Sequence, residues 1–231
     1  MNNNTHEVTE QTIEKMAEDS QQLNIALLGA PGSGKTAVAR KTVSLIKRSG
    51  GELGEWGVVD AYVDEISRNT GIPLSVSANF PQNLSIVTAR WVKEAELYHK
   101  GMSVITCGSI YESILYATLP FMLKAPEDMN PGENIFNQVM MQALGALEKT
   151  TYHYDAMFFL PFNPKMLAKN EHTWGGVINA KIPEVLEGFG KQVIVLDQKT
   201  VDAKASVVVE SISKIREFYA KIIAANVEPG V

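Results

Sequence analysis

The sequence predicts an α/β fold in which helices cover both faces of a five-stranded parallel sheet, giving a three-layer sandwich. Short apolar runs rich in Val, Ile and Phe alternate along the chain with longer segments whose apolar residues recur at helical spacing. This alternation is typical of parallel strands joined by right-handed helical crossovers. A length of 231 residues, of which 45% are hydrophobic and 20% charged, suits one globular domain.

The elements follow from period and punctuation. The predicted strands cover residues 25–28, 58–63, 103–106, 156–160 and 193–196. The predicted helices cover residues 36–48, 84–100, 133–149 and 206–224. Apolar stripes on the last three helices are expected to face the core, although a partner surface is a second explanation. These stripes contain Val87, Trp91, Ala95 and Tyr98; Ile135, Val139, Ala143 and Leu147; and Val208, Ile212, Ile215, Tyr219 and Ile222.

Residues 1–22 are polar and are expected to form a flexible arm before a domain that covers residues 23–231. The net charge of -5 argues against a broad nucleic-acid surface but leaves a local basic groove open. With one cysteine, Cys107, and no apolar leader, a cytoplasmic location is expected. Glu112 interrupts the apolar stretch at 102–123, which favours a strand and a helix over a membrane span.

An eight-residue motif, G-x-x-x-x-G-K-[ST], directly follows the first predicted strand and opens the first predicted helix. Its residues are Gly29, Ala30, Pro31, Gly32, Ser33, Gly34, Lys35 and Thr36. The glycines let successive backbone N–H groups curl around phosphate oxygens at the positive end of the helix. Lys35 would reach the β and γ phosphates of ATP, and the Thr36 hydroxyl would ligate Mg²⁺. The motif therefore predicts a nucleotide-binding P-loop.

A carboxylate is expected near the γ phosphate, because proteins with this loop hold the metal with an acidic residue at a strand end. Asp60, after the second strand, is the first candidate, and Asp64 and Glu65 are alternatives. A turn or helix-capping aspartate is the structural explanation for Asp60. The third strand ends at Cys107, which we expect to be a buried structural thiol.

The polar segment 163–176, between the fourth and fifth strands, is expected to be loop-like and to act as a mobile lid over the phosphates. The cations in and after it are Lys165, Lys169 and Lys181, for which a solvated surface is the commoner fate. Arg40 is expected on the solvent side of its helix, and an ion pair with Glu65 is favoured for Arg68.

Aromatic residues offer a second kind of contact, because their rings can stack on a base or fill the core. The candidates are Phe80, Trp91, Tyr111 and Tyr116. The four histidines show no metal spacing.

The order of features resembles the P-loop nucleoside and nucleotide kinases. The segments concerned are GAPGSGKT, VVDAYVDE at 58–65, VITCGSIYESILY at 104–116, YDAMFFLP at 154–161 and QVIVL at 192–196. The likeness is to the AAA-type ATPase/kinase domain of the ribosylnicotinamide kinase region of bacterial NAD-regulating proteins, and to bacteriophage-encoded kinases. It implies ATP with Mg²⁺ as cofactors, Asp60 as the acidic residue and a lid at 163–176. The chain departs from this family at Cys107-Gly108-Ser109, where relatives carry an acidic-Arg-Ser signature, and in a lid without arginines.

Two hypotheses follow. The first is a kinase that transfers the γ phosphate of ATP to a nucleoside-like small molecule or a modified base in nucleic acid. Lys35 and Asp60 would be its catalytic residues, and Thr36 and Asp60 its metal ligands. The alternative is an ATPase that acts as a switch or assembly factor, which should oligomerise and take an arginine in trans, with Arg90 and Arg216 as candidates. Binding without turnover is a third outcome, and a homo-oligomer and the phosphate acceptor stay open.

Overall fold

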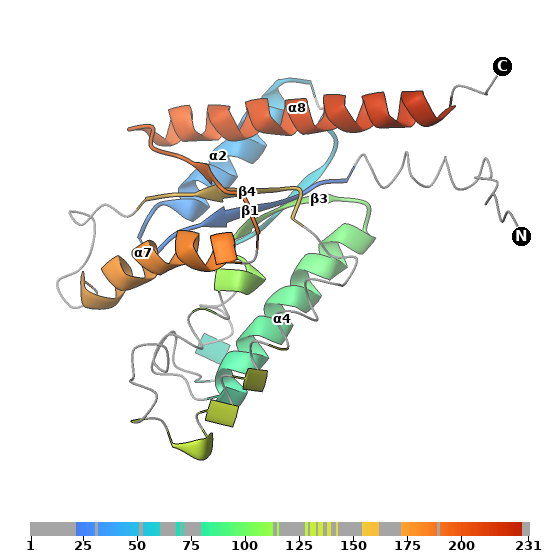
Figure 1. Ribbon diagram of the computed structural model, residues 1–231. Coiled ribbons are helices and arrows are strands. Elements are labelled where there is room, and N and C mark those ends of the chain that lie inside the picture. The colour runs from blue at the N-terminus through green and yellow to red at the C-terminus, as the bar shows by residue number, and fades with distance from the viewer. Residues whose placement is uncertain are drawn as a thin grey trace, which may run out of the picture.

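The computed structural model describes residues 22–30, 32–50, 53–60, 68–69, 71, 80–112, 115, 128, 130–132, 134–135, 138–139, 142, 154–161, 172–188 and 190–227. The predicted fold class is confirmed, since helices cover both faces of a five-stranded sheet with parallel pairing throughout (Figure 1). The strands are β1 (Asn24–Leu28), β2 (Trp56–Val59), β3 (Ser103–Cys107), β4 (Ala156–Phe159) and β5 (Ile194–Val195). Their order in the sheet is β2-β3-β1-β4-β5, so β1 lies at the centre.

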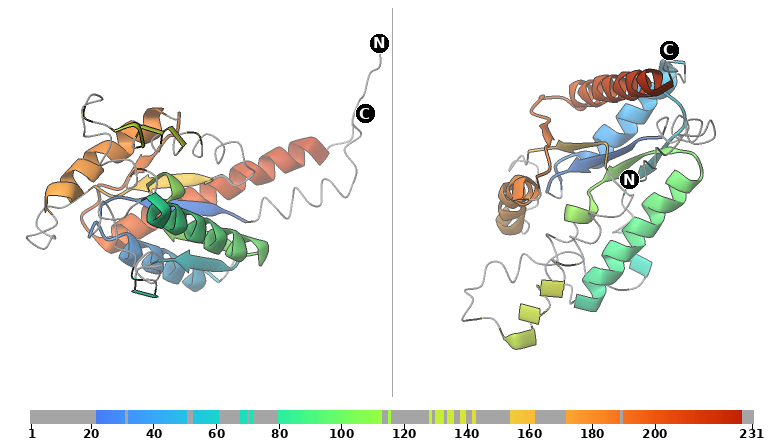
Figure 2. Two further views of the ribbon diagram at one scale, coloured as in Figure 1. Left: turned by 90° about the horizontal axis from the view of Figure 1, so that it is seen from below. Right: turned by 45° about the vertical axis from the view of Figure 1, so that its right-hand side comes forward.

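Within the described residues, four long helices form the outer layers. They are α2 (Lys35–Arg48), α4 (Phe80–His99), α7 (His172–Gly188) and α8 (Val201–Val227). In Figures 1 and 2, α2 and α8 cover one face of the sheet, while α4 and α7 lie on the other. Among the described residues, no helix is long and apolar enough to cross a lipid bilayer.

The core explains why β1 is apolar from Ile25 to Leu28. Ile25 and Leu27 point into the cluster beneath α2 and α8, whereas Ala26 and Leu28 point into the cluster shared with α7. All five β1 residues are buried. A central parallel strand covered on both faces needs such a continuous apolar run, because successive side chains point to opposite faces.

Helix α2 has a glycine with a positive φ angle directly before its start and another just after its end. Gly34 caps α2 in a left-handed conformation with φ of 92°, and no side chain caps that end of the helix. The last turn carries Lys47 and Arg48, whose positive charges suit the carboxyl end of a helix. The backbone N–H of Ser49 donates to Leu45 and Ile46, and the chain then turns at Gly50 with φ of 87°.

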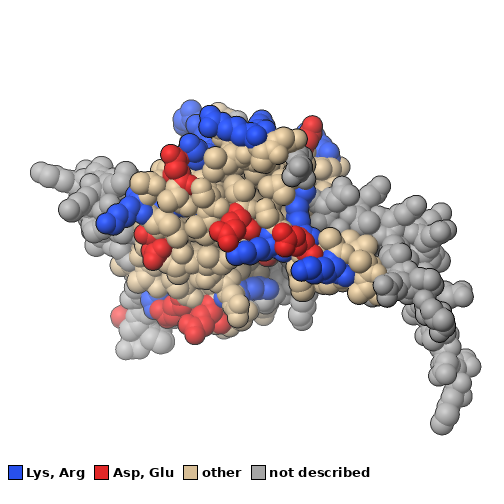
Figure 3. Space-filling model, turned by 90° about the horizontal axis from the view of Figure 1, so that it is seen from above, with Lys and Arg blue, Asp and Glu red and all other residues tan. Residues whose placement is uncertain are grey.

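Helix α8 is held on the sheet by polar contacts as well as by apolar ones. The Tyr219 hydroxyl donates to Asp155 Oδ1 at 2.8 Å, and Asp155 Oδ2 accepts the N–H of Asn24 at 2.7 Å. The helix begins five residues earlier than predicted because Thr200 Oγ1 caps it through the N–H of Ala203. In Figure 3, acidic and basic side chains alternate across the middle of this face, while basic side chains gather along its upper edge and acidic ones at its lower edge.

Three expectations about the other helices are wrong. Trp91 of α4 is 37% exposed, while the polar Arg90 and Glu94 of the same helix are buried. Ile135 and Val139 are 62% and 44% exposed, although the described residues around them are helical as predicted. The loop predicted for 163–176 is helix α7 from His172 onward, and 163–171 lie outside the described residues. The lid role of this segment stays a prediction.

Candidate functional site

The candidate site lies at the carboxyl edge of the sheet. Because all strands are parallel, the loop after β1, Asp60 after β2 and the Cys107–Glu112 stretch after β3 emerge at the same edge. Leu27 of β1 is paired with Cys107 of β3, so the starts of two of these connections are neighbours. This is the edge at which open α/β sheets bind their ligands.

The loop after β1 depends on its glycines, as predicted. Gly29, Gly32 and Gly34 have positive φ angles of 145°, 76° and 92°. A Cβ on Gly29 would lie 2.6 Å from the carbonyl oxygen of Leu160 and 2.7 Å from Ser33 Oγ. The loop thus packs directly on the end of β4, and it joins a buried strand to the start of α2. Both conditions that the motif requires for binding phosphate are met.

Some polar groups of the loop after β1 have no hydrogen-bond partner among the described residues, so they are available to a ligand. The N–H of Ser33 closes a turn by donating to the carbonyl of Ala30 at 3.1 Å, while the buried Ser33 hydroxyl has no partner among the described residues. No side chain caps the start of α2. Unmatched donors at a helix start form an anion site. Pro31, the remaining member of the motif, lies outside the described residues.

Lys35 folds back over this loop. Its ammonium group donates to the carbonyls of Gly29 and Ala30, the latter at 3.1 Å, and stands 3.5 Å from Glu112 Oε1. The side chains of Lys35 and Glu112 are only 14% and 7% exposed. The cation required by the motif is therefore held at the loop by a largely buried carboxylate.

Glu112 is the site residue that sequence inspection missed, because it stood out only as a break in an apolar stretch. Its Oε2 accepts the N–H of Gly29 at 3.3 Å, and its own N–H donates to Ser109 Oγ at 3.0 Å. The signal available was the S-x-x-E pattern at 109–112, which marks a helix start just after β3. In the usual capping box the glutamate turns back to the capping residue, but here the carboxylate reaches the loop after β1.

If the loop after β1 holds ATP as predicted, replacing Glu112 by Gln should tighten ATP binding roughly tenfold, because a negative charge near the expected position of the phosphates is removed while a hydrogen-bond acceptor for Gly29 remains. Isothermal titration calorimetry at low salt measures the change. Glu184→Gln is the matched control, since it makes the same charge change at an exposed α7 position where Glu184 pairs with Lys181. Equal effects of the two variants, or weaker binding by Glu112→Gln, would contradict an opposing charge at the phosphate site.

Asp60 carries an ion pair that the sequence did not predict. Its Oδ2 accepts from Arg40 Nε at 2.8 Å and lies 2.6 Å from Arg40 Nη2. The Arg40 side chain is largely exposed, as predicted, whereas the Asp60 side chain is 21% exposed. One carboxylate oxygen of Asp60 is thus held by Arg40 at the edge where the loop after β1 emerges.

Cys107 is buried, as predicted, and touches the start of α2. Burial raises the pKa of its thiol to about 11, and this outweighs the lowering effects of a hydrogen bond from Thr36 and of the charge on Lys35. Asp60 and Arg90 also act on this pKa, in opposite directions. The thiol is therefore protonated at neutral pH, and it is a poor ligand for a hard cation such as Mg²⁺.

The raised pKa of Cys107 predicts slow alkylation and a pH-dependent stability. Between the ordinary value of 9.0 and about 11, the unfolded chain loses its thiol proton before the folded chain does. The free energy of unfolding should therefore be unaffected by this group below pH 9 and should fall by about 2 to 3 kcal/mol by pH 11. Urea unfolding of the protein and its Cys107→Ala variant across this range isolates the effect. Parallel pH profiles for the two proteins would contradict it.

Several predicted residues lie away from this edge or outside the described residues. Lys181 pairs with Glu184 on the α7 surface at 2.6 Å, so it follows the surface prediction. Arg68 is described and exposed, but its expected partner Glu65 is not described. The other candidate residues from the sequence analysis that lie outside the described residues are Asp64, Tyr116, Lys165 and Lys169.

The two candidate trans arginines are engaged within their own chain. Arg90 is 7% exposed and donates to Thr106 and to the carbonyl of Cys107. Arg216 packs on Gly54 and donates to Ser103 at the opposite edge of the sheet. Burial lowers the pKa of Arg216. Both guanidinium groups thus bond within the same chain, and the role of either arginine in trans stays a prediction.

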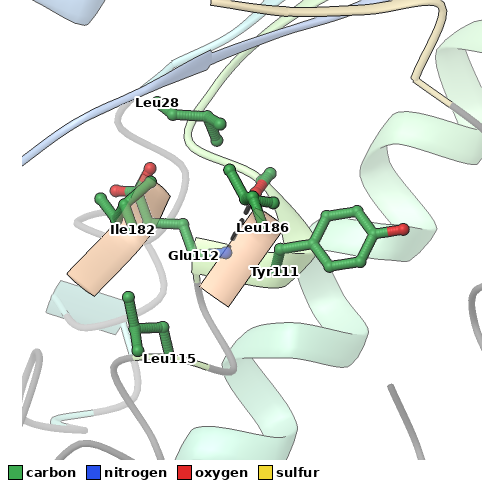
Figure 4. A pocket seen from close by; sticks show the side chains of 7 residues that line it. Leu28, Tyr111, Glu112, Leu115, Ile182 and Leu186 are labelled. Atoms are coloured by element: carbon green, nitrogen blue, oxygen red, sulfur yellow. Dashed lines mark hydrogen bonds between the residues drawn. The ribbon is translucent and has the colours of Figure 1, made fainter. Parts of the chain in front are cut away.

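A small pocket adjoins Glu112 on the α7 side of the sheet (Figure 4). Leu28 forms one wall, Ile182 and Leu186 of α7 form another, and Tyr111 lies beside Glu112. Ser109 and Leu115 complete the lining. The Tyr111 ring also lies 6.2 Å from the Tyr154 ring. The lining is apolar apart from Ser109, Glu112 and the Tyr111 hydroxyl.

Comparison with solved structures identifies the fold. A NadR protein in complex with NR superposes with a TM-score of 0.63 and 11% identity, covering 87% of this chain and 52% of that one. Thymidylate kinase from Candida albicans superposes with a TM-score of 0.56 and 16% identity, covering 84% of this chain and 93% of the kinase. Deoxyadenosine kinase from M. mycoides with bound dATP superposes with a TM-score of 0.51 and 12% identity, covering 83% of this chain and 100% of the kinase. No protein-family profile and no curated protein matches the sequence.

These neighbours share one architecture with this chain, and they confirm the P-loop kinase resemblance at the level of fold. The chain spans about half the length of the NadR protein that it matches. Identities of 11 to 16% carry the fold and not the substrate.

Proposed function

We propose that this protein is a phosphotransferase of the nucleoside or nucleotide kinase type, which moves the γ phosphate of ATP to a nucleoside-like small molecule or a nucleic-acid acceptor. The observation that carries the proposal is the glycine loop at the carboxyl edge of the β2-β3-β1-β4-β5 sheet, with the Lys35 ammonium held over it. The kinase fold of the structural neighbours supports it.

The residues of the loop divide the work. Backbone N–H groups at the start of α2 and the Ser33 hydroxyl bind phosphate oxygens, and Lys35 neutralises charge on the transferring group. For this, Lys35 must leave the carbonyls of Gly29 and Ala30 for the phosphates. Glu112 then keeps a carboxylate close to the reaction centre.

The residues present fit Mg²⁺. Thr36 supplies a hydroxyl oxygen directly after Lys35, and Asp60 supplies a carboxylate at the same edge. A metal bound with ATP would offset the negative charge of the β and γ phosphates. In the described part of the chain, no group of three or more His, Cys, Asp or Glu residues is placed to hold a metal ion by itself. The fit is therefore to a metal that arrives with the nucleotide, held by few protein ligands.

A transfer assay with γ-labelled ATP and Mg²⁺ tests the proposal. Nucleosides, nucleoside monophosphates, nicotinamide riboside and DNA with modified bases serve as separate acceptors. We expect the label to move to one acceptor class and to stay on ATP when the metal is chelated. Label released only as free phosphate, whatever the acceptor, would replace the kinase by the ATPase alternative. A protein that binds no nucleotide would refute both.

A further inference from the structure

Arg90 is a buried cation that forms no ion pair with a carboxylate of the described residues. Its Nη1 donates to the Thr106 hydroxyl at 3.3 Å and to the Cys107 carbonyl at 3.0 Å, both neutral acceptors. Its Nε is buried with no partner, and Arg90 forms no ion pair within the described part of the chain. The residue is 7% exposed. A buried charge is costly unless an anion pairs with it.

A buried carboxylate on the same helix bonds to other groups. Glu94, one turn further along α4, accepts from Thr106 at 2.7 Å and from the Tyr154 hydroxyl at 3.0 Å. Glu94 and Arg90 thus share the Thr106 hydroxyl, which donates to the carboxylate and accepts from the guanidinium. The same Tyr154 hydroxyl accepts the N–H of Ile110 at 3.1 Å, which ties this network to the turn after β3.

The guanidinium lies where a side chain at position 108 would begin. A Cβ on Gly108 would be 2.8 Å from Arg90 Nη1 and 3.0 Å from Nη2, and Gly108 has a φ of 104°. The N–H of Gly108 donates to the Leu27 carbonyl at 2.7 Å. Because neighbouring strands are about 4.8 Å apart, Arg90 sits close to the start of the phosphate loop.

We propose that Arg90 is a phosphoryl-binding residue, whose guanidinium reaches the carboxyl edge of the sheet from α4 through the space left open by Gly108. This rests on the proposed function and adds a residue to it. The family resemblance implied an arginine directly after β3, where this chain has Gly108. The positive charge is instead supplied from a different helix.

The chemistry of the group suits this role. A guanidinium presents donors in a fixed planar fork that matches two oxygens of a phosphate. Nη1 is held by Thr106 and Cys107, which fixes the orientation of the fork, whereas Nε and Nη2 have no described acceptor. The phosphoryl group could be the γ phosphate of ATP or a phosphate on the acceptor, and these two sources are separable by experiment.

The test compares Arg90→Met and Arg90→Lys with the natural protein. One arm measures ATP and ADP binding by calorimetry, and the other measures KM for a nucleoside and for its monophosphate. Arg90→Met should lose at least tenfold in its preference for ATP over ADP if the γ phosphate is the ligand. If the acceptor phosphate is the ligand, Arg90→Met should instead raise KM for the monophosphate at least tenfold and leave KM for the nucleoside unchanged. Arg90→Lys should retain part of either preference.

Tyr154→Phe is the control, because it removes two hydrogen bonds of the same buried network and leaves the cation in place. It should lower the unfolding midpoint without changing either preference. Both preferences within twofold of the natural protein in folded Arg90→Met would overturn the proposal, as would equal losses in Tyr154→Phe. If Arg90→Met does not fold, unchanged preferences in Arg90→Lys would overturn it. Failure of the natural protein to bind ATP would instead refute the proposed function.

Discussion

Replacing Lys35 by Ala should lower the rate of phosphate transfer by about 10²- to 10³-fold, because a charge aimed at the transferring phosphate is lost from a partly buried site. Initial rates with γ-labelled ATP and the acceptor that the natural protein uses measure the change. Lys47→Ala is the matched control, since Lys47 lies in the exposed last turn of the same helix. A rate within threefold of the natural protein would remove Lys35 from the reaction.

The same substitution should also lower the stability of the protein, which has to be separated from catalysis. Without Lys35, the Gly29 N–H at 3.3 Å is the one partner that the described residues leave to the Glu112 carboxylate, which stays largely buried. Removing one member of such a pair costs about 2 to 4 kcal/mol. The double variant Lys35→Ala, Glu112→Gln should regain most of this stability but none of the activity. Recovery of transfer by the double variant would show that the loss came from folding.

The fold was predictable because its signals are local. Each strand is a short apolar run, and α2 lies within one residue of its predicted start. Helix α4 shows where a local signal fails. Its apolar stripe predicted that Trp91 would be buried, but the helix turns Arg90 and Glu94 inward to bond with Thr106. A polar network can replace apolar packing only when distant partners supply its acceptors, and a periodicity argument does not see those partners.

The part of the site that lies in one sequence motif was predictable, whereas the contacts made by residues distant in sequence were not. The phosphate loop is eight consecutive residues, so its position followed from the sequence. Glu112 meets Gly29 across 83 residues, and Arg40 meets Asp60 across 20. Both contacts depend on the order of strands in the sheet, which brings β3 next to β1 and β2. The spacing of residues along the sequence does not indicate the order of the strands in the sheet.

A methyl group at Gly29 should have a large effect on stability, because two obstacles act together. The φ of 145° is unfavourable for alanine, and the new Cβ would lie 2.6 Å from the Leu160 carbonyl oxygen. That oxygen belongs to the backbone directly after β4, where the Leu160 N–H donates to Leu28 at 2.8 Å, so it cannot move independently of the sheet. We expect Gly29→Ala to lower the free energy of unfolding by about 2 to 4 kcal/mol.

Gly50→Ala isolates the contribution of the clash, since Gly50 also has a positive φ, of 87°, but no atom of the described residues lies within 4 Å of its added Cβ. This control should lose only about 1 kcal/mol, the conformational cost alone. Urea unfolding of the two variants gives the difference directly. Equal losses would mean that the loop can shift away from β4 without cost. A larger loss at Gly29 would mean that the sheet itself fixes the loop, so its N–H groups are set before any phosphate arrives and binding need not order them.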